Sequence, residues 1–378
     1  MSEEMKNINE QPEQAPVEKK PLDKKTLGII IGAVAAVVVV ALILILTLGG
    51  NGQTPDNGGN NNTAKEYTLG LGLVYGDVTN AQINATIATV VLDNEGKIVA
   101  CKIDAVQNKY TVTDSIAFTN LLTKKELGDN YHMHDYGASQ DRNGDGKVLE
   151  WDQQAAAFEA WCIGKTLDEV KNMPTQTQDD GYVISADEAL LAAGCTIQIG
   201  EFVDAVVKAG NDEFKTTFTT NGDITLGLGV NSADNGSTGD DFEATIKMNI
   251  DYAAVATVDG VIVATLNDAT QPQVTLVDNA VESTAKLISK RELKEGYNMA
   301  AYGSDNNGDG IVLEWYVQSA EFSKYLTGKT VAQVAALETQ LVNDHYISTD
   351  EALLTAGCTM QITGIQAVVL EAAGYVAE

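Results

Sequence analysis

One short pattern occurs twice in this chain, and it restricts the fold more than any other feature. Residues 141–151 read DRNGDGKVLEW, and residues 305–315 read DNNGDGIVLEW. Each copy has oxygen-bearing side chains at loop positions 1, 3 and 5 and a glycine at position 6, which is the layout of a calcium loop. A hard cation collects carboxylate and carbonyl oxygens, and the glycine permits the sharp turn. The recurrence predicts a duplicated structural unit.

Longer blocks repeat in the same order along the chain. DEALLAAGCTIQI at 187–199 matches DEALLTAGCTMQI at 350–362. A solenoid would need shorter and more numerous repeats, so we expect two tandem homologous domains. The first repeat covers 66–208, a linker covers 209–222, and the second repeat covers 223–378.

Each repeat is expected to be an α+β domain, with a small antiparallel sheet and covering helices. In the first repeat, 85–92 and 97–103 read as a hairpin around DNEG, and in the second the dipeptide Asp259-Gly260 marks a tighter hairpin. Residues 151–163 then read as a helix. Its apolar face is formed by Trp151, Ala155, Phe158 and Cys162, which recur at helical spacing.

A hydrophobic segment near the N-terminus predicts a transmembrane helix. Residues 27–48 carry no charge and would span about 33 Å as a helix, enough to cross a bilayer. Lysines precede the segment, and the next basic residue is Lys65, so the positive-inside rule predicts a cytoplasmic, disordered tail at 1–26 and an extracellular remainder. Residues 49–65, rich in glycine and asparagine, are expected to be a flexible linker. A cleaved signal peptide is the alternative.

The charge balance excludes one class of partner. The chain has 24 Lys+Arg against 53 Asp+Glu, whereas a nucleic-acid-binding protein needs a basic surface. We therefore expect a single-pass protein of the cell membrane whose exported part binds cations and a cell-surface or protein partner. The cysteines show no CxxC spacing and are expected to be small buried side chains, with a Cys101–Cys162 disulfide as the alternative.

The two loops predict specific calcium ligands. For loop 141–152 they are Asp141, Asn143, Asp145, the backbone carbonyl of Lys147 and, at position 12, Asp152. For loop 305–316 they are Asp305, Asn307, Asp309 and the backbone carbonyl of Ile311. Position 12 of the second loop is Tyr316, so Glu150 and Glu314, at position 10, are the alternative closing ligands. A polar turn without a metal, ahead of a helix that favours acids at its start, is the competing interpretation.

Aromatic and sulfur-containing side chains recur beside the loops. They are Tyr131, Met133 and Trp151 in the first repeat and Tyr297, Met299 and Trp315 in the second. We expect them to be core anchors, and the alternative is an aromatic wall for a flat ligand. His132 and His134 have no histidine at the matching positions of the second repeat, and no nucleophile–base arrangement is visible. The sequence therefore predicts a protein that is not an enzyme.

The order of the blocks resembles a family of membrane-anchored surface proteins from clostridia and related Gram-positive bacteria, described as FMN-binding-domain-like. The blocks are TLGLG, VVLDNEGKIVACKIDAVQ, TKKELGDNYHM, LEW with Gln154, GKT and TIQIGEFVDAVVKA. They cover most of 66–208 and, more weakly, 223–378. The resemblance implies a small α+β domain that holds flavin in extracellular electron transfer.

The chain departs from the pattern that carries covalent flavin in that family. The attachment motif is Asp-x-x-Ser/Thr-Gly-Ala-Ser/Thr, and the nearest match here is Gly137-Ala138-Ser139. Tyr136 stands where Ser or Thr is required, and Met133 stands where Asp is required. We therefore expect a membrane-anchored extracellular binding or scaffold protein stabilised by Ca²⁺. The alternative is an extracellular electron-transfer protein that binds FMN non-covalently.

Overall fold

The computed structural model describes residues 63–135 and 141–376. The predicted tail at 1–26, the membrane segment at 27–48 and almost all of the linker at 49–65 lie outside these residues. Within the described ranges, no helix is both long and apolar enough to cross a bilayer. The structure is mixed α+β with antiparallel sheets, as the sequence predicts. Residues Asn62–Glu378 fall into one compact unit.

The first repeat supplies most of one antiparallel sheet, in the order β4-β3-β2-β1-β7. Its strands are β1 (Lys65–Val78), β2 (Gln82–Asp93), β3 (Ile98–Val112), β4 (Ile116–Asn120) and β7 (Thr216–Thr220). The predicted hairpin is the β2–β3 pair, whose turn is closed by Asp93: its Oδ1 accepts hydrogen bonds from the backbone N–H groups of Glu95 and Lys97.

The second sheet lies in the second repeat. Its strands are β8 (Thr225–Asp234), β9 (Thr238–Gly239), β10 (Glu243–Val258), β11 (Val261–Thr270), β12 (Gln273–Val277) and β13 (Ala280–Ala285). The long strand β10 pairs with β11 and β8 along one stretch and with β12 and β9 along the other. The β10–β11 turn is the predicted Asp259-Gly260, and both residues have positive φ, as the tight hairpin turn requires.

Corresponding helices follow in both repeats. The first has α2 (Lys124–Leu127), η1 (Gly128–Tyr131), α3 (Trp151–Cys162), α4 (Leu167–Lys171), the hairpin β5 (Thr175–Thr177)–β6 (Val183–Ser185), α5 (Glu188–Ala192) and α6 (Gly200–Asn211). The second has α7 (Lys290–Leu293), η3 (Lys294–Tyr297), α8 (Met299–Tyr302), α9 (Trp315–Leu326), α10 (Val331–Ala335), the hairpin β14 (Thr339–Val342)–β15 (His345–Ser348), α11 (Glu351–Thr355) and α12 (Thr363–Ala372). The predicted apolar face of α3 is buried in full.

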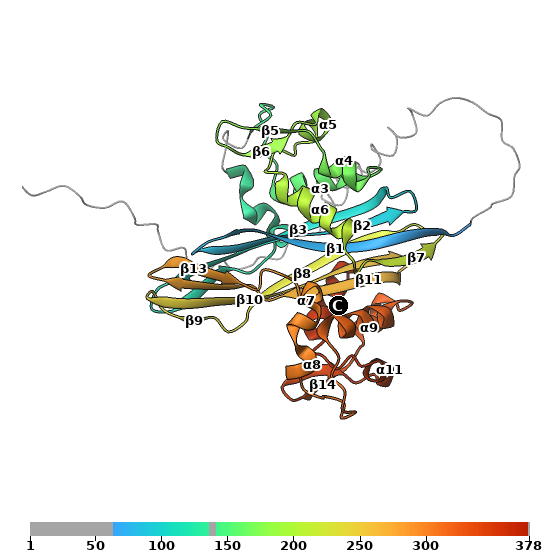
Figure 1. The fold of residues 1–378 in the computed structure, drawn as a ribbon. Helices are drawn as coiled ribbons and strands as arrows, with labels where there is room; N and C mark the ends of the chain where they lie inside the picture. The colour runs from blue at the N-terminus through green and yellow to red at the C-terminus, as the bar shows by residue number, and fades with distance from the viewer. Residues whose placement is uncertain (1–62, 136–140, 377–378) are drawn as a thin grey trace, which may run out of the picture. The chain divides into compact units, whose positions relative to one another are not determined.

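The two sheets pack face to face, and the helices cover their outer faces (Figure 1). Helices α3 and α6 lie on the first sheet, and α9 and α12 lie on the second. Between the sheets, Leu71 and Ile87 of the first repeat pack in one cluster with Tyr252 and Leu266 of the second. The repeats therefore share a hydrophobic core instead of packing as two independent domains.

This layering explains why strand β2 is apolar without alternation. Its run ATIATVVL is buried at every position, because one face meets helices and the other meets the second sheet. A strand that is buried on both faces loses the alternation of apolar and polar residues that a half-exposed strand shows.

The TLGLG blocks bring a strand and a helix into backbone contact. A Cβ on Gly70 would lie 2.0 Å from the carbonyl oxygen of Ala209 in α6, and one on Gly229 would lie 2.0 Å from that of Val368 in α12. These distances are too short for any side chain, so glycine lets α6 and α12 sit directly on β1 and β8. The block is a packing device in both repeats.

The segment between the repeats, expected to be a linker, takes part in the fold. Strand β7 lies within 209–222 and pairs with β1. Just before β7, the ring of Phe214 lies 4.5 Å from the guanidinium of Arg291 and 6.0 Å from the ring of Tyr316. The connection is thus fixed to both repeats.

The four cysteines are buried and unpaired, as expected. Cys101 in β3 and Cys162 at the end of α3 lie close enough for a hydrogen bond between their thiols. That contact and burial raise the pKa of Cys101 well above its usual value. The second repeat has Thr265 and Leu326 at the corresponding positions, so the thiol pair belongs to the first repeat alone.

Candidate functional site

The first Asn/Asp-rich loop is folded around its own carboxylates. Asp141 accepts hydrogen bonds from the backbone N–H groups of Asp145 at 3.0 Å and Gly146 at 2.9 Å, and Asp145 accepts one from Lys147 at 2.8 Å. Asn143 donates to the carbonyl oxygen of Leu191 at the end of α5, which fixes the loop to the helical layer. The carboxylates of positions 1 and 5 therefore converge on one short turn.

The second loop repeats this arrangement. Asp305 accepts from the N–H groups of Gly308 at 2.8 Å and Gly310 at 2.9 Å, and Asn307 donates to the carbonyl oxygen of Leu354 in α11. Ile311 N–H donates to Asp309 at 2.7 Å, matching the Lys147–Asp145 bond. Thus four of the predicted ligand positions in each loop, positions 1, 3, 5 and 7, make matching contacts.

Position 12 separates the two loops. The Oδ1 atom of Asp152 is shielded from solvent and has no hydrogen-bond partner within the described residues. An ionised carboxylate oxygen buried without a partner is costly, so a bound cation at this end of the loop would supply what it lacks. In the second loop, the Tyr316 hydroxyl donates to Glu295 and its ring meets Phe214, so this side chain is engaged elsewhere.

The glutamates at position 10, which the sequence suggests as alternative calcium ligands, bind backbone N–H groups of the Y-x-M segment. Glu150 accepts hydrogen bonds from the backbone N–H groups of Met133 and His134 and from His134 Nδ1, and Glu314 accepts from those of Met299 and Ala300. Although burial acts to raise it, these bonds lower the pKa of Glu150 below its usual range. Both glutamates therefore anchor the Y-x-M segment.

Side chains of Asp, Glu, His and Cys alone do not make a metal site here. In 63–135 and 141–376, no three of them lie close enough together to hold an ion. Asp141, Asp145 and Asp152 are therefore not gathered around one point, and a calcium loop here would depend on Asn143 and backbone carbonyl oxygens for further ligands.

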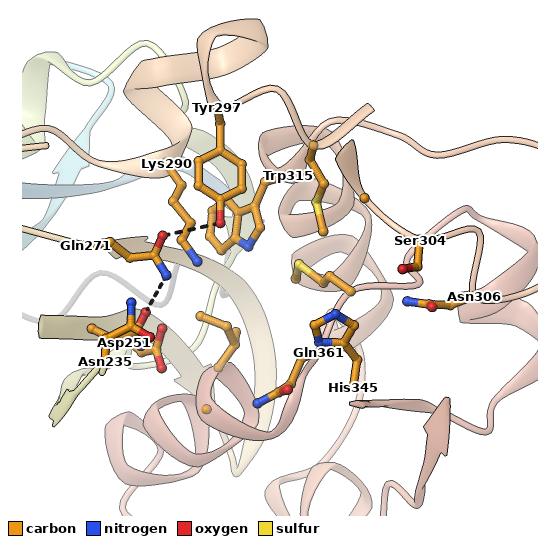
Figure 2. Close-up of a pocket in the computed structure, with 16 residues that line it drawn as sticks. Asn235, Asp251, Gln271, Lys290, Tyr297, Ser304, Asn306, Trp315, His345 and Gln361 are labelled. Atoms are coloured by element: carbon orange, nitrogen blue, oxygen red, sulfur yellow. Dashed lines mark hydrogen bonds between the residues drawn. The ribbon is translucent and has the colours of Figure 1, made fainter. Parts of the chain in front are cut away.

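A cavity of about 430 Å³ lies beside the second loop, between the sheet and its helices (Figure 2). Tyr297, Met299 and Trp315, considered from sequence as an aromatic wall, all line it. Figure 2 shows Lys290 beside the Tyr297 and Trp315 rings, with Asp251 and Gln271 on the sheet side and His345 and Gln361 across the cavity.

The first repeat has a cavity of about 390 Å³ at the matching place. Tyr131, Met133 and Trp151 line it. The further matching pairs are Asn84 and Asn249, Thr86 and Asp251, Gln107 and Gln271, Lys124 and Lys290, Arg142 and Asn306, Tyr182 and His345, Ile197 and Met360, Gln198 and Gln361, Glu201 and Gly364, and Phe202 and Ile365. The fold therefore builds the same pocket twice.

Each pocket touches the calcium-type loop through loop position 2. Arg142 donates to Asp180 at 2.9 Å and stacks on the Tyr182 ring at 4.4 Å. In the second repeat, Asn306 donates to the carbonyl oxygen of Thr359 and accepts from Asn343, which precedes β15. The loop thus forms part of the pocket wall in both repeats.

Burial perturbs one ionisable group in each pocket. Burial lowers the pKa of Lys124 to about 8, against the attraction of Glu201 and Asp104. Burial also raises the pKa of Asp251 in the other pocket, and the charge of Lys290 and a hydrogen bond with Asn249 oppose this rise. Ionisable groups perturbed by burial inside a cavity are typical of ligand sites.

Sequence reasoning placed the aromatic residues of these pockets but missed the polar ones. Lys124 and Lys290 stand in the matched blocks TKKEL and SKREL, Gln107 lies within β3, and Gln271 directly follows the matched strand β11. The recurrence of these residues in both repeats was the sequence signal that could have identified them as pocket residues. Nothing in the spacing showed that a strand end, a one-turn helix and a loop would converge on one cavity.

Comparison with family models, curated proteins and solved structures finds no match to this chain.

Proposed function

We propose that this chain is a membrane-anchored extracellular binding protein, stabilised by Ca²⁺, with a small-molecule pocket in each of two tandem homologous domains. The observation that carries the binding function is the repetition of the pocket: two cavities with matching linings occur at equivalent places. A cavity of this size suits a small ligand or part of a larger one. If the two domains served only as structural support, nothing would require both cavities to be retained.

The proposed role of Ca²⁺ is to fix one wall of each pocket. In the first loop, Asp141, Asn143, Asp145 and the Lys147 carbonyl would hold the ion, and Asp152, which is not gathered with Asp141 and Asp145 around one point, would close the shell only if the loop rearranged on binding. Such a loop supplies only oxygen ligands, which suits a hard divalent cation. The second loop lacks the closing carboxylate, so we propose weaker binding there.

Thermal unfolding of the full-length protein tests the calcium proposal. A chelator should lower the melting temperature, and Asp145→Ala should shrink that difference, because it removes one carboxylate from the shell. Asp114→Ala, an exposed acid in the β3–β4 turn, is the matched control and should leave the difference intact. A melting curve indifferent to chelator would remove Ca²⁺ from the proposal and leave the pockets in place.

Flavin binding is the second candidate, because Tyr131, Met133 and Trp151 and their counterparts line the pockets. A planar isoalloxazine ring could lie against such walls, and the protein would then carry electrons. Purification distinguishes the candidates: a yellow protein with the visible absorption of oxidised flavin would favour FMN, and a colourless one would favour the first proposal.

The proposed anchor is the apolar segment 27–48, with 1–26 in the cytoplasm and the domains outside the cell. Protease added to intact cells should then remove the C-terminal domains and spare an N-terminal tag. The reverse pattern would contradict the proposed orientation.

A further inference from the structure

We infer that each pocket binds a small zwitterion, of the class of free α-amino acids with an apolar side chain. The inference rests on the binding function proposed above and names the ligand class of the same pockets. It is carried by an ammonium group, a carboxylate and apolar side chains that line the same cavity in both repeats, and the first pocket has Asp77 and Arg142 in addition.

The ammonium group is held in place by two aromatic rings. Lys290 Nζ lies 5.1 Å from the ring centre of Tyr297 and 5.3 Å from that of Trp315. Lys124 is placed in the same way, at 5.2 Å from Tyr131 and 5.3 Å from Trp151. Cation–π contacts position the charge without using its N–H donors. Neither ammonium group has a hydrogen-bond partner in 63–135 or 141–376, so these donors are available to the carboxylate of a ligand.

The carboxylate comes from different elements in the two repeats. In the first pocket it is Glu201 on α6, which accepts a hydrogen bond from Thr86 of β2 at 2.8 Å. In the second pocket the strand position carries Asp251 and the helix position carries Gly364. A Cβ on Gly364 would lie 2.3 Å from Asp251 Oδ2, so the aspartate occupies the space that the glycine leaves. An acid thus interacts with the lysine in each pocket although its sequence position changes, and Asp77 is a second acid in the lining of the first pocket.

A simpler explanation is that the acid only neutralises a buried lysine. Elsewhere in this protein partly exposed lysines are in direct contact with their acids: Lys125 lies 2.6 Å from Glu159, and Lys208 lies 2.8 Å from Glu292. Figure 2 shows no such contact between Lys290 and Asp251, and the two interact only through their charges. Two opposite charges that face one cavity without pairing are suited to a ligand that bridges them.

The remaining walls define the rest of the ligand. Met299, Met360 and Ile365 form apolar surface in the second pocket, and Met133, Ile197 and Phe202 do so in the first. These side chains favour an aliphatic, thioether or aromatic side group over a charged one. Leucine, methionine and phenylalanine therefore represent the class.

The test is calorimetric titration of the full-length protein with three matched probes: L-leucine, isocaproate, which lacks the ammonium group, and isoamylamine, which lacks the carboxylate. We expect L-leucine to bind, and each analogue to bind at least about tenfold more weakly, because each leaves one buried charge of the pocket without a partner. This comparison needs no variant and so does not depend on whether a mutant folds.

Variants assign the binding to the pockets. Lys290→Met or Asp251→Asn should remove the second site and leave the first, and Lys124→Met combined with Lys290→Met should abolish binding. Lys329→Met is the matched control, because its ammonium stacks on the Tyr325 ring at 3.9 Å outside both pockets. It should leave binding unchanged.

The outcomes separate this inference from the proposed function. Isocaproate binding as tightly as L-leucine would replace the zwitterion with a simple anion and overturn the inference. So would the failure of leucine, methionine and phenylalanine alike. If native mass spectrometry then still showed another small molecule on the purified protein, the pockets would keep their binding function. If it showed none, the zwitterion inference and the proposed binding function would both be wrong.

Discussion

At the scale of single residues, the structure repeatedly assigns one polar side chain to hold together segments that are distant in sequence. Gln154 is the clearest case. Its amide donates to the carbonyl oxygen of Leu149, at the end of the loop, and accepts from the N–H of Thr196. Gln318 makes the same pair of bonds to Leu313 and Thr359.

Gln154→Leu should therefore destabilise the protein. The change keeps the side chain's approximate size but removes the Gln154 bonds to the part-buried carbonyl of Leu149 and to the buried N–H of Thr196, at about 1–3 kcal/mol each. Urea unfolding measures the loss. A loss well below about 1 kcal/mol would contradict this account.

Another residue-scale feature is a charge asymmetry where the repeats meet. Lys208 of α6 pairs with Glu292 at 2.8 Å and donates to the carbonyl oxygen of Leu73. The matching residue in α12 is Glu371, which accepts from the backbone of Val230 instead. Burial, Glu126 and Asp104 raise the pKa of Glu371 to about 7.

The folded state therefore holds a proton on Glu371 that the unfolded chain releases, and this group's contribution to stability falls as pH rises from about 4.5 to about 7. Glu371→Gln should flatten that part of the stability–pH profile. Glu371→Lys should pair with Glu126 and stabilise the protein at pH 8 by about 0.5–1 kcal/mol, since the carboxylate lies near the surface. A destabilised Lys variant would contradict the geometry.

At the scale of elements, the fit between strand β1 and helix α6 depends on the absence of side chains. Gly70→Ala should force the backbone of α6 away from the sheet and lower the melting temperature by more than ordinary surface substitutions do, at about 1–3 kcal/mol. Gly200→Ala is the matched control, because a Cβ there meets nothing within 4 Å and the residue begins the same helix. Equal melting temperatures of the two variants would show that α6 adjusts freely.

The same scale shows how far the sequence could predict the structure. The hairpins and α3 follow from local patterns, namely the turn residues Asp259-Gly260 and the spacing of Trp151, Ala155, Phe158 and Cys162. Strand β7 was missed, because TTFTT is short and lies in a polar stretch, and its pairing with β1 is set by tertiary contacts. The position-10 glutamates were considered as ligands, because spacing alone cannot show that a carboxylate is already bound to backbone N–H groups.

The pockets show more clearly where prediction from the sequence ends. The aromatic residues could be singled out because they recur beside the loops. Glu201 and Asp251 could not be recognised as the same charge, because the acid moves from helix to strand between the repeats. Only coordinates bring two different sequence positions to one point in space.

At the scale of the whole molecule, the shared core between the sheets predicts a single cooperative unfolding transition. Trp315→Phe leaves Trp151 and Trp161 to report on the first repeat, and the double change of those two residues leaves Trp315 to report on the second. Both variants should give coincident midpoints in urea, because Leu71, Ile87 and Tyr252 belong to one cluster. Midpoints that differ would show that the repeats unfold independently.

The face-to-face sheets also bear on what one repeat could do alone. The face carrying Leu71, Leu73 and Ile87 would have no cover without the second sheet, and an apolar surface of that extent does not stay in water. A single-repeat ancestor would therefore have been a homodimer, and fusion of its two genes would have turned an association between chains into a folding step within one chain. The unequal charges at Lys208 and Glu371 are changes that only such a fused pair could acquire, because a homodimer must carry the same residue on both sides.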